Sequence, residues 1–427
     1  MNKEFAKFIG YLLLSRLYLP SVASAMEPTR PAEHKTALSM YKAPRHDRSV
    51  NSRPVHVYQP NIMRQMEYDL ANDRIGRLIN QAQQCSRAKP GSQRNADERL
   101  CEAVLAGAYG TQGNLASAAK AELKLDPGGI SMTLFKTGAG TYGAYYVSNP
   151  KLLFGTKNPS FDVSRPTIIK WAASLCPGYN NAVVGRINGR SECIGIDIGS
   201  PASSLSSNTA SATRTQIFRT DGLLTDFASD IGQANKVQLH NVMIRHLFLV
   251  VMPRKDTGRT QNLLGLNSIM HFKSVGFTTK GVTIDNVISG LHCSAALQFS
   301  TSSLPAIRGI MLTGSINGTA VHLIADSGFN GPLLLFSRRL VNDRQPVLGY
   351  ALVNKKATGN RARTAMYRVS FSLMGNNIGP TLAPLVDRPF ANFSESSSID
   401  GLVGLPVLER LGITFDFANR KICTAYQ

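Results

Sequence analysis

The chain has 427 residues, of which 43% are hydrophobic and 17% are charged, and its formal net charge is +20. The apolar content is too high for a disordered chain, and the length suggests two or three domains, because single cores rarely grow beyond about 250 to 300 residues. The excess of Lys and Arg predicts attraction to anionic surfaces such as those of a cell envelope. These residues are spread along the chain without base-reading spacing, so no specific nucleic-acid partner is expected.

The first 25 residues have the order of a secretory signal peptide. Lys3 and Lys7 precede an apolar run from Phe8 to Leu14, and Ala23-Ser24-Ala25 has the small residues of a cleavage site. Arg16 interrupts the apolar part and leaves open an uncleaved segment near a membrane. No other stretch reaches the roughly 18 uncharged apolar residues of a transmembrane helix. We therefore expect an exported bacterial protein, periplasmic or secreted.

Residues 26–60 carry Pro and charge without periodicity, which predicts a flexible leader. Residues 61–165 form a helical and mixed N-terminal region. Helical spacing from about 62 to 123, interrupted at Pro90-Gly91-Ser92, predicts a helical hairpin. The stretch 128–165 is rich in Gly, Tyr, Phe and Thr and predicts strands or loops. A prosegment, a strand pair added to the following domain and a small adaptor remain open for this region.

The six cysteines are an even number, which suits an oxidising compartment. Their order suggests three disulfides, which would join Cys85 to Cys101, Cys176 to Cys193, and Cys293 to Cys423. Reduced, buried cysteines that act as small hydrophobic residues are the alternative. Neither a Cys-x-x-Cys motif nor a clustered His set is present, so no metal is expected.

From residue 166 onward the chain consists of short β-type runs separated by Gly, Asn, Ser and Pro, which is typical of an all-β barrel or sandwich. The stretch Ser203 to Thr215 is rich in Ser, Thr and Ala and is expected to be a surface loop. The expected strands are Ala182 to Ile187, Cys193 to Ile196, Leu247 to Met252, Ile310 to Ile316, Val321 to Ala325 and Tyr367 to Met374.

One pattern occurs twice in this part of the chain. Ile187-Asn188-Gly189 leads to Asp197-Ile198-Gly199, and Ile316-Asn317-Gly318 leads to Asp326-Ser327-Gly328, with the same offset from Asn to Asp. Each copy is followed by an apolar-apolar-Gly block, at Gly265 in the first and Gly404 in the second. A chance repeat would not keep both blocks in order, so the sequence predicts two related lobes that meet at a cleft.

These features resemble the pepsin and retropepsin family of aspartic proteases, in which an Asp-x-Gly loop follows an apolar strand. Here the strands are Ile194-Gly195-Ile196 and Leu323-Ile324-Ala325, and the stretch from Gly401 to Phe417 is similar to the closing segment of retroviral-type proteases. The resemblance covers about residues 166–427. It implies a mainly β, two-lobed, pepsin-like acid protease fold, with lobes at 166–300 and 301–427. Because family members often carry an inhibitory leader, it also favours a prosegment before the first lobe.

The resemblance implies that Asp197 and Asp326 are the catalytic pair of an aspartic endopeptidase that needs no cofactor. One carboxylate would take a proton from a bound water, and the other, protonated, would donate to the peptide carbonyl oxygen. Two carboxyls about 3 Å apart share one proton and titrate as a coupled pair, so activity is expected at acid pH. The supporting positions are the tight-turn glycines and neighbouring hydroxyls, namely Gly199, Ser200, Ser327, Gly328, Gly265 and Gly404.

The chain departs from the family pattern at two positions. The family has a hydroxyl residue after each catalytic Asp that bonds the opposite loop; Ser327 can do this, whereas Ile198 cannot. After the glycine, Ser200 suits a hydroxyl that bonds a carboxylate, whereas Phe329 has no donor. A catalytically inactive protein that binds peptide or envelope components in the cleft is therefore the alternative, and a purely structural envelope protein is a third. We expect a monomer that acts on a peptide or protein substrate.

Pepsin-like enzymes also cover the cleft with a flap that carries a tyrosine, but no tyrosine occurs between Asn181 and Gly349. A flap is expected near Phe218 to Gln233, with Gly222 and Gly232 as flexible points. Phe218 or Phe227 would then cover the substrate.

Overall fold

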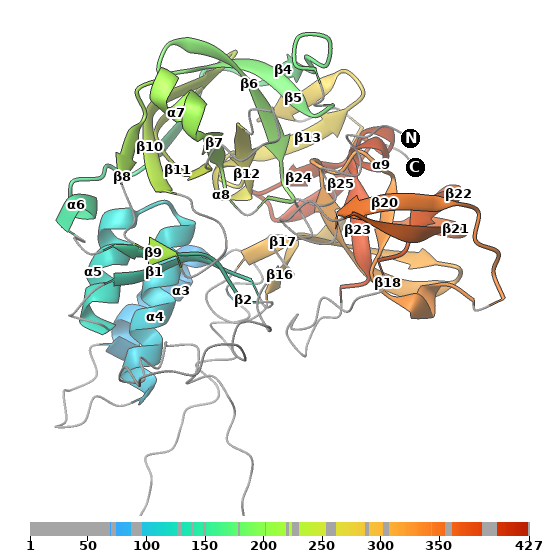
Figure 1. The fold of residues 1–427 in the computed structure, drawn as a ribbon, viewed down its shortest axis with the longest axis horizontal. Helices are drawn as coiled ribbons and strands as arrows, with labels where there is room; N and C mark the ends of the chain where they lie inside the picture. The colour runs from blue at the N-terminus through green and yellow to red at the C-terminus, as the bar shows by residue number, and fades with distance from the viewer. Residues whose placement is uncertain are drawn as a thin grey trace, which may run out of the picture.

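The computed structural model describes residues 69, 74–86, 96–125, 130–137, 140–147, 151–177, 180–200, 202–218, 222–223, 230–252, 262–286, 290–301, 307–342, 344–354, 361–386 and 399–425. The signal peptide, the leader and Phe227 lie outside these residues. The described part is mainly β, with two lobes and a small helical region before them (Figure 1). The fold class expected from the sequence is therefore confirmed. No helix in the described ranges is long and apolar enough to span a membrane.

The N-terminal helices are α3 (Ile75–Ser86), α4 (Ala96–Thr111) and α5 (Leu115–Leu125). Apolar side chains of α3 and α4 form a small core of their own, and the Cys85–Cys101 disulfide joins these two helices. Gly113 has a φ of +72°, which glycine adopts without strain, and allows the tight turn into α5. Asn114 then caps α5, since its Oδ1 accepts a hydrogen bond of 3.1 Å from the Ser117 N–H.

Between these helices and the first lobe lie an antiparallel hairpin, a short helix and a strand. They are β1 (Ile130–Thr137), β2 (Gly140–Val147), α6 (Lys151–Phe154) and β3 (Ser160–Val163). The hairpin continues into β9 (Gly222–Leu223), which belongs by sequence to the first lobe. Strand β3 lies before the expected start of the first lobe at residue 166, yet it pairs with β11 of that lobe.

The first lobe is built on a sheet of order β3-β11-β7-β12-β6-β5-β10-β8. Its strands after β3 are β5 (Ala182–Ile187), β6 (Arg190–Asp197), β7 (Ser204–Ser206), β8 (Gln216–Phe218), β10 (Asp230–Leu239), β11 (Val242–Met252) and β12 (Leu263–Gly265), and the helices are α7 (Ser207–Ala212) and α8 (Leu266–Ile269). The surface loop expected from Ser203 to Thr215 is wrong. Most of it is β7 and α7, because the Ser206 hydroxyl caps the helix by accepting from the Thr209 N–H at 3.0 Å.

The second lobe repeats this plan in a sheet of order β19-β23-β18-β17-β21-β20, with β16 beside β17 and β22 beside β21. Its strands are β16 (Gln298–Thr301), β17 (Ile307–Ile316), β18 (Thr319–Asp326), β19 (Leu333–Leu335), β20 (Tyr350–Asn354), β21 (Arg361–Leu373), β22 (Asn376–Pro384) and β23 (Gly401–Gly404), and the helical elements are η3 (Arg338–Leu340) and α9 (Leu405–Arg410).

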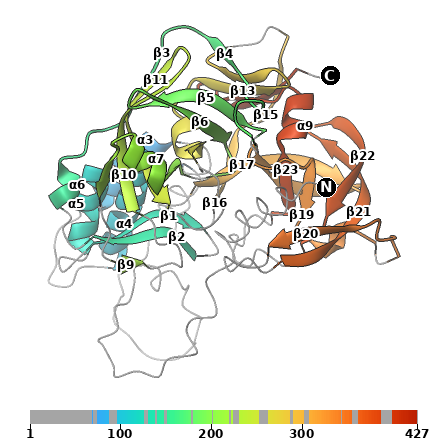
Figure 2. The ribbon, with the colours of Figure 1, turned by 45° about the horizontal axis from the view of Figure 1, so that its top comes forward.

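A third sheet of order β15-β25-β24-β13-β14-β4 takes strands from both halves of the sequence and joins the lobes (Figure 2). Its strands are β4 (Thr167–Lys170), β13 (Ser274–Thr278), β14 (Gly281–Ile284), β15 (His292–Ala296), β24 (Thr414–Asp416) and β25 (Lys421–Thr424). Phe277 of β13 packs edge to face on Phe415 of β24, with ring centroids 6.2 Å apart. One apolar cluster runs through both lobes and this sheet, so the lobes share a continuous core.

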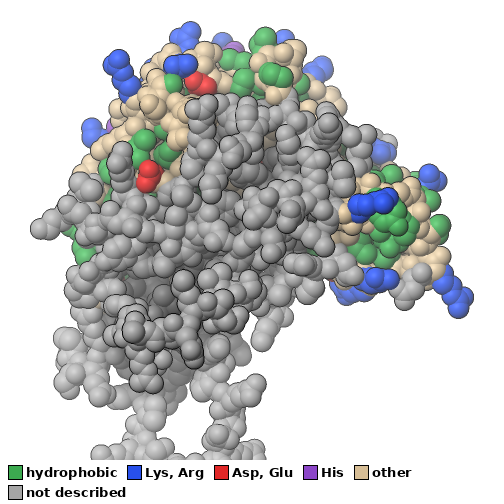
Figure 3. All heavy atoms as spheres, viewed as in Figure 1, with side chains coloured by type: hydrophobic (Ala, Val, Ile, Leu, Met, Phe, Trp, Pro, Cys, Tyr) green, Lys and Arg blue, Asp and Glu red, His purple; other side chains and the backbone are tan. Residues whose placement is uncertain are grey.

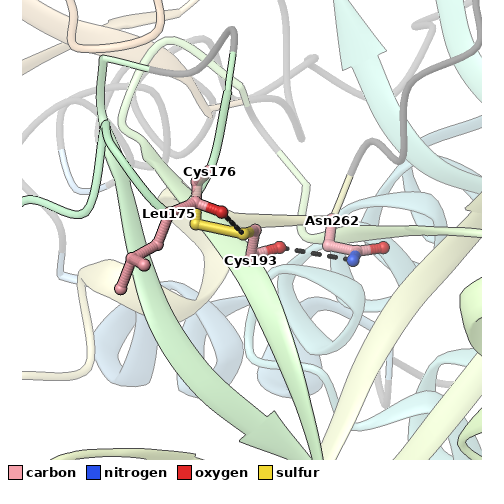
Figure 4. The surroundings of a disulfide bond; sticks show 4 residues. All are labelled: Leu175, Cys176, Cys193 and Asn262. Carbon is pink, nitrogen blue, oxygen red and sulfur yellow. Dashed lines mark hydrogen bonds between the residues drawn. A yellow bond between two sulfur atoms is a disulfide. The ribbon is translucent and has the colours of Figure 1, made fainter.

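The disulfides pair as the sequence order suggests. Besides Cys85–Cys101, the structure has Cys176–Cys193 and Cys293–Cys423. Figure 4 shows the bond of Cys193, which lies in β6, the strand that ends at Asp197. The Asn262 side chain donates to the Cys193 carbonyl at 3.3 Å, so β6 is held on two sides before it reaches the aspartate.

On the face shown in Figure 3, Lys and Arg side chains are scattered over the described parts of both lobes, and few Asp or Glu side chains accompany them.

Candidate active site

Asp197 and Asp326 occupy the same place in the two lobes. Each is the last residue of a strand, β6 or β18, and both side chains belong to buried residues, 2% and 0% exposed. On one side each strand pairs with its hairpin partner, and on the other it runs parallel to a short strand. The parallel register places Gly265 opposite Asp197 and Gly404 opposite Asp326. The downstream glycine blocks therefore lie beside the aspartates.

The repeated Asn-Gly pairs form the hairpin turns that lead into these strands. Asn188 and Gly189 have φ values of 49° and 91°, and Asn317 and Gly318 have 51° and 80°. Two successive positive φ angles are typical of a type I′ turn, whose twist matches that of the strands. The Ile-Asn-Gly part of the repeat thus sets the register of the two strands that end in Asp197 and Asp326.

The two Asn side chains also tie each turn to two other segments. Asn188 accepts from the Lys236 N–H at 2.9 Å and donates to the Thr213 carbonyl at 2.9 Å. Asn317 accepts from the Ser370 N–H at 2.9 Å and donates to the Leu340 carbonyl at 2.9 Å. The matching bonds show that both asparagines are structural. Only the spacing of the repeat, and no property of a single residue, indicated this role in the sequence.

The two Asp-x-Gly loops meet at Gly199. Its N–H donates to Asp197 Oδ1 at 2.9 Å. A Cβ added to it would lie 2.3 Å from Cγ and Oδ1 of Asp326. Gly199 therefore lies between the two carboxyl groups, and only a glycine lets the Asp326 carboxyl come this close. In the second loop the Gly328 N–H donates to Asp326 Oδ1 at 3.1 Å, which mirrors the first.

Ser327 joins the loops across the interface between the lobes. Its hydroxyl accepts from the Ile198 N–H at 3.0 Å and donates to the Ile196 carbonyl at 2.8 Å. The reverse bond is not formed, because the corresponding residue Ile198 has no hydroxyl; its aliphatic side chain is fully buried in the shared core instead. The cross-lobe bond expected for Ser327 is thus present in one direction.

Ser200 and Phe329, the residues that follow the glycines of the two Asp-x-Gly loops, make different contacts. The Ser200 hydroxyl donates to the Ala202 carbonyl at 2.8 Å, whereas its backbone N–H donates to Asp197 Oδ1 at 3.1 Å. The expectation that this hydroxyl bonds a carboxylate is therefore wrong, because the turn directs it to a carbonyl of its own loop. Phe329 is fully buried in an apolar cluster with Leu334 and Leu402, so it anchors the second loop.

Gly265 and Gly404 pass directly behind the loops. A Cβ at Gly265 would lie 2.3 Å from the carbonyl carbon and oxygen of Ala202, and one at Gly404 would lie 1.9 Å from the Gly331 carbonyl oxygen. No side chain fits at either place. The requirement for glycine in the apolar-apolar-Gly blocks is therefore steric.

A buried polar network supports the first loop and was missed by sequence reasoning. The Ser203 hydroxyl accepts from the Gly265 N–H at 3.0 Å, donates to Asn267 Oδ1 at 3.0 Å and lies 2.6 Å from the Ser268 hydroxyl. Asn267 Oδ1 also accepts from the Ser203 N–H at 2.8 Å. These partners are distant in sequence, and the only available signal was the polar pair that follows Gly265 in an otherwise apolar stretch.

The expected flap is corrected at two positions. Phe218 is 5% exposed and belongs to a cluster with α5, so it does not cover a substrate. Gly232 lies within β10, and a Cβ there would be 2.9 Å from Val251 Cγ2, so close packing explains it rather than flexibility. Gly222 lies in β9 and pairs with Tyr146 of the N-terminal hairpin. Among the described residues there is no group of three or more His, Cys, Asp or Glu side chains that could hold a metal.

No protein-family model matches this sequence, and no curated protein sequence matches it. Among solved structures, the aspartic proteinase from Irpex lacteus is similar at 12% identity over 62% of this chain and 98% of its own, with a TM-score of 0.38. A protein described as edgp is 11% identical over 63% of this chain and 95% of its own, with a TM-score of 0.35. Basic 7S globulin from soybean is 10% identical over 63% and 95%, also with a TM-score of 0.35. At these identities the likeness concerns the fold alone.

Proposed function

We propose that this protein is a pepsin-like aspartic endopeptidase, with Asp197 and Asp326 as its catalytic pair. The observation that carries the proposal is Gly199, whose N–H bonds Asp197 and whose missing Cβ leaves room for the Asp326 carboxyl. Two carboxyls held beside each other by backbone N–H donors, on loops from separate lobes, are suited to activating a water between them.

In this mechanism one carboxylate accepts a proton from the bound water, while the oxygen of that water attacks the peptide carbonyl carbon. The other carboxyl, protonated, donates its proton to the carbonyl oxygen, which gives a neutral tetrahedral diol. Transfer of a proton to the leaving nitrogen then breaks the C–N bond. The pair titrates as a unit, so activity is expected at acid pH.

The protein is proposed to be exported, because three disulfides join parts of the described chain and such bonds persist in oxidising compartments. Residues 166–300 and 301–427 would be the two catalytic lobes, in a monomer with a peptide or protein substrate. We also propose that the stretch from Gly401 to Phe417 is a closing segment of the retroviral type. The parallel pairing of Gly401 to Gly404 with β18 supports this. The basic surface would attract anionic envelope components.

A second candidate is a protein that binds peptide in the same place without hydrolysis. It is favoured by Ile198, which removes one of the two cross-lobe hydroxyls. One lost hydrogen bond weakens the alignment of the loops by about 1 kcal/mol, and the covalent link between the lobes limits the consequence.

The test is to incubate the purified chain with a mixed peptide library from pH 3 to 7, with and without pepstatin, beside the Asp326→Asn variant. Asn keeps an oxygen that can accept from the Gly328 N–H, so the variant should fold. Cleavage that peaks in acid, stops with pepstatin and is absent from the variant would support the endopeptidase. A folded wild type that cleaves nothing, but binds library peptides equally before and after the substitution, would favour the binding protein.

A further inference from the structure

The N-terminal helices and the first lobe share one apolar cluster. Each of its buried members is at most 5% exposed. The members are Leu115, Ala118 and Ala119 of α5, Leu153 of α6, Phe218 of β8, Ile231 of β10, Phe248 and Val250 of β11, and Ala202 of the first Asp-x-Gly loop. Removal of α5 would therefore expose apolar side chains of three first-lobe strands to water.

Two further contacts seal this junction. Gly113, at the turn before α5, fits against the first lobe, since a Cβ there would lie 2.9 Å from Pro159 Cγ and 3.9 Å from Phe248 Cβ. Gln233 of β10, only 3% exposed, donates to the Lys157 carbonyl at 2.7 Å and accepts from its N–H at 3.3 Å. The segment that follows the helices is thus bonded into the interior of the lobe.

The hairpin β1–β2 extends this contact to both lobes. Strand β2 pairs with β9, which follows β8 in the first lobe, and β1 contacts β17 of the second lobe. Figures 1 and 2 both show the hairpin running from beneath the first lobe toward β16 and β17. The N-terminal region therefore contacts both halves of the proposed enzyme.

Ala202 connects this junction to the aspartate. Its carbonyl accepts from the Ser200 hydroxyl at 2.8 Å, and the Ser200 N–H donates to Asp197 Oδ1 at 3.1 Å. The backbone of Ala202 also lies where a Cβ on Gly265 would be. The loop is thus confined between Gly265 on one side and the α5 cluster on the other.

We propose that the N-terminal helices are a permanent support of the first catalytic loop rather than a segment that leaves on maturation, with Leu115 as a positioning residue. The kinetic consequences of this proposal rest on the proposed function, whereas the lasting attachment of the helices to the lobes does not depend on it. Loosening the α5 cluster would let Ala202 move, and Ser200 would move with it because its hydroxyl is bonded to the Ala202 carbonyl. The Ser200 N–H would then be displaced from Asp197 Oδ1. A carboxylate that loses an N–H donor holds its proton more tightly.

Permanence is tested by cutting the chain. A recognition sequence for a specific endoprotease is inserted between Leu125 and Ile130, and the folded protein is cut there and passed over a size-exclusion column without denaturant. After the cut, no covalent bond joins the helical fragment to the lobes. We expect the fragment to co-elute with the lobes nevertheless, because the apolar cluster around α5 holds it there. Dissociation of the fragment under these conditions would overturn the proposal, whatever happens to activity.

Positioning is tested by a matched pair of cavities. Leu115 and Leu78 are both fully buried in the same helical region, but Leu78 lies in the core of α3 and α4, away from the first lobe. Leu115→Ala is expected to lower kcat about tenfold, with KM within about twofold, and to move the acid limb of the pH profile upward. Leu78→Ala should lower the melting temperature and leave both kinetic constants within about twofold.

Equal kinetic effects of the two substitutions, or none from either, would overturn the positioning role. Were Leu115→Ala unable to fold, the cutting experiment would still decide whether the helices are permanent. An inactive wild type would contradict the proposed function. Co-elution of the fragment would still show that the helices stay attached to the lobes, so the two failures are distinguishable.

Discussion

The two Asp-x-Gly loops share one backbone geometry and are supported by different chemistry. Behind the first loop, Ser203, Asn267 and Ser268 form a buried hydrogen-bond network that receives the Gly265 N–H. Behind the second, the Gly404 N–H donates at 3.2 Å to the backbone carbonyl of Pro332, and Phe329 fills an apolar cluster. The support behind Gly265 in the first lobe is therefore a polar network, whereas the second loop is held by the apolar cluster around Phe329.

This difference separates what a duplicated site requires from what it tolerates. The asparagine turns, the aspartates and the glycines recur because backbone conformation and steric space leave no other choice at these positions. The groups behind the two loops differ, since any group that accepts from the glycine N–H and fills the volume can serve there. We therefore expect the clash created at a shared glycine to cost at least as much as the loss of a support at a divergent position.

The largest effect is expected at a shared glycine. Gly404→Ala places a methyl group 1.9 Å from a backbone oxygen, and relief needs movement of the loop itself, so the free energy of unfolding should fall by more than about 3 kcal/mol. Chemical denaturation measures this. Gly76→Ala in α3, which meets nothing within 4 Å, is the control and should change stability by less than about 1 kcal/mol. A Gly404→Ala protein as stable as the control would show that the glycine repeat is not steric.

Next come the divergent supports. Phe329→Ala empties a fully buried site and should cost about 3 to 5 kcal/mol. Ser203→Ala leaves the Gly265 N–H without its acceptor and should cost about 1 to 3 kcal/mol. Urea unfolding of both variants orders the two supports. If Ser203→Ala cost as much as Phe329→Ala, the contrast between an apolar and a polar support would have no energetic meaning.

A smaller effect is expected at the cross-lobe bonds. Ser327→Ala removes the partner of the Ile198 N–H and the Ile196 carbonyl and should lower the free energy of unfolding by about 1 to 3 kcal/mol. Ile198→Thr adds a hydroxyl on the other side at the loss of some apolar burial, and should stay within about 1 kcal/mol of wild type. Calorimetry of both variants compares them. A stability loss from Ile198→Thr larger than that from Ser327→Ala would mean that the core contact of Ile198 outweighs the bond of Ser327.

The smallest effect is a pH response of opposite sign in the two lobes. In the first, burial and the positive charges of Lys157 and Arg245 lower the pKa of His246. Below about pH 6.5 the unfolded chain therefore binds more protons at this histidine than the folded chain does, so the free energy of unfolding decreases as pH falls. In the second, burial raises the pKa of Glu409, although a hydrogen bond from Trp171 opposes it. The folded chain then binds more protons, so stability is lost as pH rises above the usual range of a glutamate.

Melting temperatures of His246→Gln and Glu409→Gln between pH 4 and 8 measure these two responses. His246→Gln should gain most over wild type in acid, and Glu409→Gln should gain most at neutral pH. Parallel curves for either variant and the wild type would show that its titration does not contribute to stability.

Local repeats could be predicted from the sequence, and contacts between distant segments could not. The Asp-x-Gly loops and the disulfide pairs followed from spacing and order alone. The junction of α5 with Ala202 and the pairing of β2 with β9 left no local pattern, because each partner reads as an ordinary apolar or β-type residue. The Ser, Thr and Ala content around Ser203 predicts a loop, because the partner that buries this hydroxyl, Asn267, is remote in sequence. The sequence shows that Phe329 lacks a hydroxyl but not that its ring fills an apolar cluster.

The proposed function requires Asp197 and Asp326 to act as one unit across the two lobes. The most direct measurement is kcat/KM for one cleaved peptide at the pH optimum in Asp197→Asn and Asp326→Asn, with the melting temperature of each as a folding control. We predict that either substitution alone lowers kcat/KM by about a thousandfold or more, while the protein stays folded. A folded variant that keeps activity within about tenfold of wild type would contradict the account.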